Sequence, residues 1–400
     1  MPAPSPGNAR GSTPGKTPGH TATGRPTSDA NRLGLDYHVE AGAFAYDGPV
    51  IDIHTHVSSP DAAAVYFRAA RRYGVIKSWT MCGLPAAQTL DRELSQDDRR
   101  ELEFIAVPNF TARDQPETFT TQWLKDLESF RDLGARIVKF WAAPRGIDFA
   151  NDALRLDSPV RLEGMKRSYD LGYRVFMTHV GDPDTWFATT YKDAAKYGAK
   201  ADQFKPLSKL LDQYHDVTWI GAHMGGWPED LDWLSAFLER HPNYVVDCSA
   251  TKWQVRELSK HPERLARFCR DFQGRVLFGT DIVAAAGNVH PPSPDGPPTP
   301  GAPAGFNPDA GYGYDLYASR FWATRTLFET GYDGPSPIVD PDFRLVDPDA
   351  PAKQTARLVG ANLAPDPLRS LYYDAACQLL APLGGLFEGE AAPIPCGASA

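Results

Sequence analysis

The sequence predicts an α/β protein with the (β/α)8 architecture of the TIM barrel, built as a single catalytic domain. Short apolar runs that suit buried strands alternate with stretches whose apolar residues recur at helical spacing. The runs follow one another at roughly three dozen residues, the repeat expected of a closed barrel of strands and helices. An open doubly wound sheet is the alternative, but no glycine-rich dinucleotide-binding turn follows an early run. The predicted strands span 50–54, 75–82, 102–108, 136–141, 173–179, 217–223, 244–249 and 275–281.

The stretches between these runs predict helices. Between 123 and 133 apolar residues recur at helical spacing, and Gly134 ends the pattern. Between 231 and 238 the same spacing follows Pro228, Glu229 and Asp230, whose acids suit a helix N-terminus. Residues 250–270 carry a similar pattern.

Composition divides the chain into a barrel and two tails. Residues 1–34 are mostly Pro, Gly, Ser, Thr and Ala, so we predict a disordered tail there, the barrel over 35–385 and a loose tail over 386–400. Residues 284–313 form a long Pro/Gly-rich loop directly after the eighth strand, consistent with either a lid over the active-site face or a floppy insertion. Beyond it we expect a helix over 316–330, an irregular connection over 331–365 and a closing helix over 367–380.

The overall charge and the cysteines narrow the class of protein. A net charge of -9 argues against a nucleic-acid or anionic-membrane surface, and no apolar run is long enough to cross a membrane. The five cysteines are scattered without a C-x-x-C pair, which favours reduced thiols over a disulfide frame or a structural zinc site. We therefore expect a cytoplasmic protein that acts on a small molecule, with assembly into a homo-oligomer left open.

Chemically capable side chains stand at the carboxyl ends of the predicted strands. His54 and His56 are two apart on the first strand and would project from one face, and imidazole is the commonest neutral metal ligand. A barrel brings residues from different strand ends together on one face, where the active site is built. Histidines and an acid at so many strand ends predict a metal site. The full set is His54, His56, Lys139, His179, His223 and Asp281.

The ordered motifs I-D-I-H-T-H, M-T-H-V-G, I-G-A-H-M-G-G and L-F-G-T-D resemble the amidohydrolase superfamily, and more closely its branch of lactonases and non-oxidative decarboxylases. The resemblance covers about residues 47–283 and the segment L-Y-Y-D-A-A of the closing helix. It implies a divalent metal, with zinc expected, bound by His54, His56, His179 and Asp281. It also implies that Asp281 takes a proton from metal-bound water. His223 would be a ligand to a second metal or a catalytic group beside the first.

The chemical state of Lys139 determines whether the site is expected to hold one metal ion or two. Strand alternation lets this side chain point inward, where a free ammonium about 4 Å from a dication would repel it by several kcal/mol. An inward Lys139 close to the metal must therefore be neutral, or carboxylated into a bridging carbamate as in the binuclear members that the motif R-I-V-K-F-W resembles. The alternative is an unmodified, salt-bridged lysine, as in mononuclear members.

Several neighbouring residues are candidates for substrate contact. Arg145, in the loop after the fourth strand, can clamp a substrate carboxylate with two hydrogen bonds, although a surface charge is the alternative. Trp141, Trp186 and Trp227 each follow a ligand strand and are predicted to wall an apolar pocket or to pack at its rim. Asp52 is predicted to share the face of His54 and to orient a histidine.

These residues together predict a metal-dependent hydrolase of an amide, lactone or ester bond. The alternative is a non-oxidative decarboxylase of an aromatic or enol carboxylic acid that uses the same site, because a fold and a ligand set do not fix the reaction. A binding barrel with a degenerate site is a third hypothesis, which the intact set of ligands disfavours.

Overall fold

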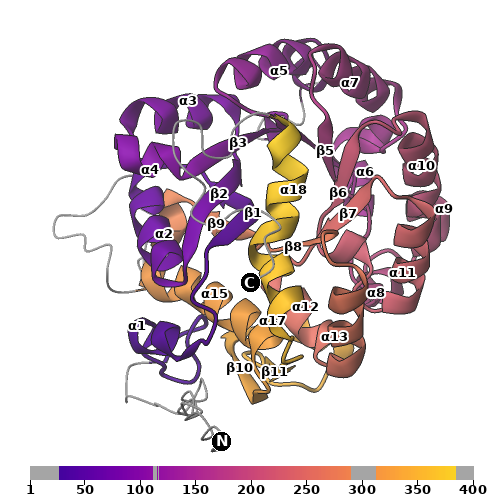
Figure 1. The fold of residues 1–400 in the computed structure, drawn as a ribbon. Helices are drawn as coiled ribbons and strands as arrows, with labels where there is room; N and C mark the ends of the chain where they lie inside the picture. Colours follow the sequence, from indigo (N-terminus) through magenta and orange to yellow (C-terminus); the bar gives the residue numbers. More distant parts are fainter. Residues whose placement is uncertain (1–26, 111–114, 116, 290–311, 384–400) are drawn as a thin grey trace, which may run out of the picture.

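A computed structural model describes residues 27–110, 115, 117–289 and 312–383. Parallel strands form a ring at the centre, and helices surround it, so the chain is an α/β TIM barrel (Figure 1). The strands of the ring are β1 (Val50–Val57), β2 (Val75–Met81), β3 (Leu102–Ala106), β4 (Ile137–Trp141), β5 (Val175–His179), β6 (Thr218–Gly221), β7 (Tyr244–Asp247), β8 (Val276–Leu277) and β9 (Ile282–Ala284).

The two edges of this sheet belong to one short stretch of chain. In the order of hydrogen-bonded neighbours the sheet runs from β8 through β7 to β1 and ends at β9, and every pairing is parallel. Only residues 278–281 separate β8 from β9, so this stretch joins both edges. The N–H of Ile53 donates to the carbonyl of Phe278 at 3.0 Å, and the N–H of Asp281 donates to the carbonyl of His54 at 2.8 Å. The ring is thereby closed.

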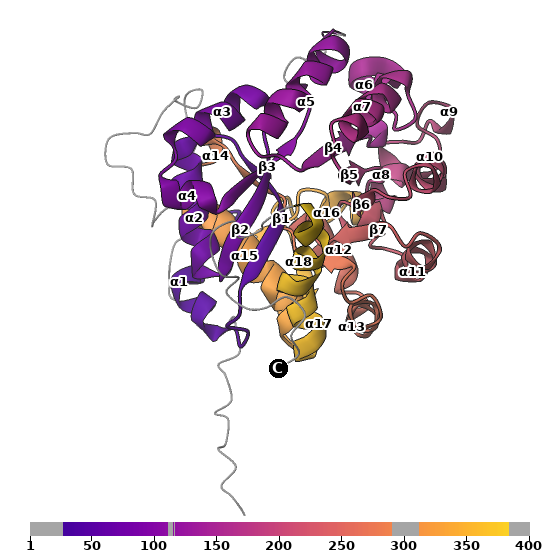
Figure 2. The same cartoon turned by 45° about the horizontal axis from the view of Figure 1, so that its top comes forward.

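Helices cover the outside of the ring, as both views show (Figure 2). Many begin at a capping residue: Ser59 accepts from the N–H of Ala62 ahead of Pro60, and Asp230 accepts from the N–H of Trp233. The helices are α1 (Tyr37–Glu40), α2 (Pro60–Arg72), α3 (Leu84–Glu93), α4 (Gln96–Arg100), α5 (Trp123–Asp132), α6 (Ile147–Ala150), α7 (Pro159–Asp170), α8 (Asp184–Thr189), α9 (Ala194–Tyr197), α10 (Lys200–Gln213), α11 (Leu231–Arg240), α12 (Thr251–Leu258), α13 (Pro262–Asp271), α14 (Ala286–Val289), α15 (Tyr312–Glu329), α16 (Phe343–Val346), α17 (Pro365–Arg369) and α18 (Ala375–Leu380).

The interior of the ring is filled by apolar side chains and covered by α18. Ile51, Ile137 and Val175, each near the start of its strand, belong to the same buried cluster as Cys377 and Leu380 of α18. Figure 1 shows α18 lying across the ring. Because α18 packs with the amino ends of the strands, the carboxyl ends are left for a site.

The predicted pattern of strands and helices is confirmed across the ring. Each of the eight predicted runs contains a strand, and the predicted helices at 123–133 and 231–238 are α5 and α11. The eighth run differs in detail, since its ladder stops at Leu277 and a second short strand, β9, pairs with β1. The change of partner occurs where Asp281 adopts a left-handed backbone conformation with φ 58°.

Two segments differ from the sequence expectation. Residues 27–34, assigned to the tail, are folded: the N–H of Arg32 donates to Pro337 O, the N–H of Val339 donates to Asp29 O, both at 2.8 Å, and Asn31 is buried. Residues 331–365, expected to be irregular, contain an antiparallel pair, β10 (Asp333–Val339) and β11 (Thr355–Val359).

The predicted tails and the lid lie largely outside the described residues. This holds for 1–26 and 384–400, and for 290–311 within the predicted loop 284–313. The described ends of that loop form β9, α14 and the start of α15. The closing helix is confirmed as α17 and α18, joined by a π-helical turn over Ser370–Asp374. Among the helices of the described chain, none has both the length and the hydrophobicity needed to cross a membrane.

A buried ion pair fastens α15 to the chain that leads into the barrel. Arg325 donates to Glu329 at 2.8 Å, to the carbonyl of Tyr46 at 2.7 Å and to the carbonyl of Tyr73 at 3.1 Å. Glu329 also accepts from the N–H of Tyr46 at 2.7 Å and from the hydroxyl of Tyr372 at 3.3 Å. Both charged side chains are at most 5% exposed, so each depends on the other for compensation.

Replacing Arg325 by methionine is therefore expected to destabilise the barrel. Arg325→Met leaves Glu329 buried without its countercharge, and we expect the free energy of unfolding to fall by about 3–5 kcal/mol. The matched control is Arg357→Met, which breaks an exposed ion pair with Asp333 and should leave the unfolding midpoint nearly unchanged. Urea unfolding followed by circular dichroism measures both. Equal midpoints for the two variants would contradict the assigned role of Arg325.

Candidate functional site

The predicted metal-binding and catalytic residues all lie at or just after the carboxyl ends of the barrel strands. The ring places these ends on the side opposite to α18, and the side chains converge from several strands that are far apart in sequence. They are His54 and His56 in β1, Lys139 in β4, His179 in β5, His223 after β6 and Asp281 between β8 and β9.

His54 and His56 meet Asp281 where the ring closes. His56 Nε2 lies 3.1 Å and His54 Nε2 lies 3.5 Å from Asp281 Oδ1. One possible ligand atom from each residue lies within 4.8 Å of the others. The register between β1 and β2 shifts just after Asp52, and both Ile53 and His54 lie inside the ring. This break in strict alternation places His54 over the site.

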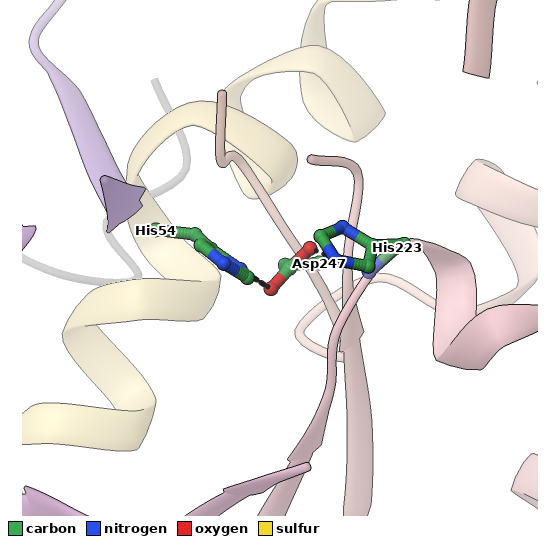
Figure 3. A group of neighbouring side chains, drawn as sticks. All are labelled: His54, His223 and Asp247. Carbon is green, nitrogen blue, oxygen red and sulfur yellow. Dashed lines mark hydrogen bonds and ion pairs between the residues drawn. The ribbon is translucent and has the colours of Figure 1, made fainter. Parts of the chain in front are cut away.

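His54 is oriented by Asp247, the last residue of β7. Asp247 Oδ2 lies 2.7 Å from His54 Nδ1, and Oδ1 accepts from the N–H groups of His223 at 2.9 Å and Ser249 at 3.0 Å. Figure 3 shows this carboxylate between the two histidines. Asp247 is fully buried, so its carboxylate fixes His54 with Nδ1–H as donor and Nε2 free to face Asp281. Asp247 was not among the residues predicted from the sequence, where its only signal is an acid at the end of an apolar run.

The same carboxylate sets the tautomer of His223. The Ser249 hydroxyl donates to Asp247 and lies 2.8 Å from His223 Nδ1. Its single proton is used on Asp247, so His223 Nδ1 must donate to the Ser249 oxygen. His223 Nε2 is therefore left with a lone pair. Its ring lies 5.0 Å from the His54 ring and 4.6 Å from the His179 ring, measured between centroids.

His179 is held differently from the other histidines. Its Nε2 lies 2.9 Å from Asp182 Oδ1, and the hydroxyl of Tyr191 donates to Asp182 Oδ2 at 2.6 Å. Among the described residues, the groups close enough to share an ion are His54, His56 and Asp281, and His54, His223 and Asp247. The structure therefore brings His179 beside the site but does not gather its nitrogen with the other predicted ligands.

Burial and neighbouring charges give these side chains the protonation states that a metal needs. Burial lowers the pKa of His54, with a further decrease from Lys139, and burial lowers the pKa of His223 well below its usual value. Burial alone would raise the pKa of Asp281, but the hydrogen bond with His56 and the nearby imidazoles hold it well below its usual range. Neutral imidazoles and an ionised carboxylate are the donors that a divalent cation accepts, so these residues fit a metal.

Backbone strain is concentrated at the same place. His223, Ala250 and Asp281 have φ values of 60°, 66° and 58°, in the left-handed region that non-glycine residues rarely adopt. They follow β6, β7 and β8 at the carboxyl end of the ring. Such conformations cost about 1–3 kcal/mol each and persist where the surrounding structure holds them, often at functional sites.

Lys139 points into the site, as predicted, and is buried. Burial lowers its pKa to about 8, although the charges of Asp247 and Asp281 oppose this effect. In the described part of the chain no carboxylate forms an ion pair with it. Its amine can therefore lose a proton near neutral pH, which a nearby dication would favour further.

Comparison with known proteins agrees with this geometry. A family profile described as Amidohydrolase matches residues 51–319, which contain every predicted ligand. The chain belongs to the amidohydrolase family. No curated protein matches it.

Solved structures similar to this amidohydrolase include two proteins of low sequence identity. One is an uncharacterised TIM-barrel protein from Bordetella bronchiseptica, with 13% identity, a TM-score of 0.43, and coverage of 83% of this chain and 98% of that one. Another is the 5-carboxyvanillate decarboxylase of Sphingomonas paucimobilis, with 12% identity, a TM-score of 0.33, and coverage of 58% of this chain and 88% of that one.

Two cavities of the amidohydrolase meet at the site and share His179, His223 and Asp281 in their walls. The first, of about 580 Å³, is mostly apolar and also contains His54, His56 and Lys139; we call it the apolar cavity. The second, of about 450 Å³, is bordered by charged residues of α12, α15 and the segment after β10; we call it the charged cavity. A substrate placed at Asp281 can therefore extend in two directions.

The predicted substrate-contacting residues are divided between these cavities. Trp141 and Arg145 line the apolar cavity, and Trp186 lines the charged cavity. Trp227 is among the lining residues of neither cavity; its ring lies 5.5 Å from that of Phe204 in an aromatic cluster, which agrees with the packing alternative predicted for it.

The prediction for Asp52 also needs correction. Its carboxylate accepts from the Tyr66 hydroxyl of α2 at 3.2 Å and from the Thr280 hydroxyl at 2.7 Å, so it faces away from the His54 ring. It accepts from the backbone N–H of His54 at 3.2 Å, whereas Asp247 holds the imidazole.

Asp247→Asn is expected to weaken metal binding without removing a ligand of the His54, His56 and Asp281 group. The amide carries no charge to fix His54 Nδ1–H, and we expect the affinity for a divalent metal to fall about 10- to 100-fold. Competition with a chromophoric chelator measures this affinity. Asp232→Asn, an exposed acid paired with Arg264, is the control and should match the wild type. An unchanged affinity in Asp247→Asn would refute the orienting role.

Proposed function

We propose that this amidohydrolase is a metal-dependent hydrolase that cleaves an amide, lactone or ester bond of a small molecule. The observation that carries the proposal is the convergence of His54, His56 and Asp281 at the junction of two cavities, with both histidines presenting Nε2 toward the carboxylate. Members of the amidohydrolase family typically depend on a metal, and this donor set suits one.

His54, His56 and Asp281 would hold the metal, and zinc is the ion we expect from nitrogen and carboxylate donors. His179 is a further proposed ligand, which requires its ring to exchange Asp182 for the ion. When bound, a divalent cation lowers the pKa of water and polarises a carbonyl oxygen.

Asp281 and His223 are the proposed groups that move protons. The ionised carboxylate of Asp281 accepts a proton from the attacking water and returns it to the leaving group. His223 presents the lone pair of Nε2 toward the same region, since its Nδ1–H is committed to Ser249. In this position His223 would assist beside the negative oxygen that develops on the carbonyl.

Activity of site variants tests this assignment. In a screen of amide, lactone and ester substrates, we expect Asp281→Asn to lower kcat/KM by about 10²- to 10⁴-fold, because the general base is lost. The control Asp216→Asn alters an exposed acid that accepts from Tyr169 and should retain full activity. Removal of the metal by a chelator should abolish turnover, and zinc should restore it. Full activity in the chelator-treated protein would overturn the proposal.

We propose that Lys139 acts as an unmodified amine beside a single ion. Its pKa of about 8 gives it access to the neutral form, in which it does not repel a dication. The same neutral amine is the form that can react with carbon dioxide, so a carbamate that bridges two ions is the alternative.

Metal analysis distinguishes the two states of Lys139. We expect a metal-to-protein ratio near one that Lys139→Ala leaves unchanged. The exposed Lys166, which pairs with Asp170, provides the control Lys166→Ala. A ratio near two in bicarbonate that falls in Lys139→Ala, but not in Lys166→Ala, would assign the carbamate instead.

A second candidate is non-oxidative decarboxylation of an aromatic or enol carboxylic acid at the same site. Arg145 lines the mostly apolar cavity together with Lys139, and its guanidinium suits the carboxylate of a planar acid. The guanidinium of Arg145 lies 5.5 Å from the ring of Phe149 and 5.8 Å from that of Trp186. Release of carbon dioxide from such acids, with no hydrolysis of esters, lactones or amides, would favour this candidate over the hydrolase.

A further inference from the structure

We propose that Lys252 and Arg320 form a subsite for an anionic group, a carboxylate or a phosphate, in the charged cavity. This goes beyond the reaction at Asp281, because it assigns the substrate a second, non-reacting charged end. The subsite rests on the proposed function only in one respect, namely that the bound anion is part of the substrate. The binding of an anion as such does not depend on turnover.

Helix packing brings the two cations together. Helix α12 packs against α15, and the hydroxyls of Thr251 and Thr324 lie 3.3 Å apart at their contact. Lys252 follows Thr251 directly, and Arg320 lies one helical turn before Thr324 on the same side of α15. Both cations line the charged cavity, which also includes His223 and Asp281.

Within the described chain neither cation has a carboxylate at ion-pairing distance. Arg320 is steadied by one nitrogen, Nη1, which donates to the carbonyl of Leu316 at 2.7 Å and to the hydroxyl of Ser319 at 2.9 Å. Burial lowers the pKa of Arg320 to about 10. The pKa of Lys252 is also lowered, mainly by burial and to a smaller extent by repulsion from Arg320. Two cations that repel each other in a partly buried wall are costly without a counter-ion.

The acids of the same cavity are already engaged. Each carboxylate in the described wall has its own hydrogen-bond donor or counter-ion, and none of them forms an ion pair with Lys252 or Arg320. Asp340 pairs with Arg256, Asp342 accepts from Trp186 Nε1 at 3.1 Å, Asp182 is bonded to His179 and Tyr191, and Asp281 contacts His54 and His56. The acids that reach Lys252 electrostatically, among them Asp340 and Asp342, offset only part of its desolvation, since its pKa stays lowered.

This arrangement defines a substrate with three parts. An anionic end lies against Lys252 and Arg320, the reacting carbonyl lies at Asp281, and an apolar part occupies the cavity of Trp141 and Lys139. Carboxylates and phosphates both offer several acceptor oxygens to a guanidinium and an ammonium, so the chemistry of recognition is shared.

Calorimetric titration of the full-length, metal-loaded protein with inorganic phosphate and, separately, with succinate tests the subsite. We expect saturable binding of at least one ion, and the tighter of the two identifies the preferred group. Lys252→Gln and Arg320→Gln should each weaken that binding about ten- to a hundredfold, since each removes a charged donor. Lys252→Arg and Arg320→Lys keep the charge and should retain most of the affinity.

The matched controls are Lys205→Gln and Arg270→Gln, which remove exposed cations paired with Asp202 and Asp271 and should bind the ions as the wild type does. Thermal unfolding of every variant shows whether it is folded. No saturable binding of either ion, or the same affinity in the Lys252→Gln/Arg320→Gln double variant, would overturn the subsite. Binding that depends on both cations in a protein without hydrolase activity would keep the subsite and reject the proposed reaction.

Discussion

The site depends on one buried carboxylate, that of Asp247. It binds the His54 ring through one oxygen and the backbone N–H groups of His223 and Ser249 through the other. Burial alone would raise its pKa, but the contacts with His54 hold the pKa well below the usual range, so the charge persists in the interior. A single anion thus fixes the orientation of one histidine and the backbone position of another.

The closed barrel stabilises this arrangement. A left-handed backbone at His223, Ala250 and Asp281 and a charge at Asp247 each cost free energy, and closed strands with α18 packed into the ring supply a rigid frame that holds them. The segments that follow β4 and β7 then contribute to different cavities, with Arg145 in the wall of the apolar cavity and Lys252 of α12 in the wall of the charged cavity.

The barrel and several residues at its strand ends were predictable from sequence, because local apolar runs mark the strands and the carboxyl ends of parallel barrel strands lie on one face. His54, His56 and Asp281 were found in this way. Asp247 was not, since an acid inside an apolar run has no partner nearby in sequence, and its partner His54 belongs to another strand. The position of the Trp227 ring against Phe204 was left open, because proximity to a ligand strand does not tell whether a ring faces a cavity or packs among other side chains. The strand β10 was missed because Pro335 and Pro337 lack the N–H that a ladder uses.

The break between β8 and β9 couples the assembly of the site to the completion of the ring. Asp281 is supplied by the last stretch that joins the two edges of the sheet, whereas His54 belongs to the first strand. Until residues 278–281 join the two edges, the carboxylate is not placed beside the histidines. Contacts between residues so far apart in sequence form slowly, so the pairing of Asp281 with His54 and His56 depends on the folding of the whole ring.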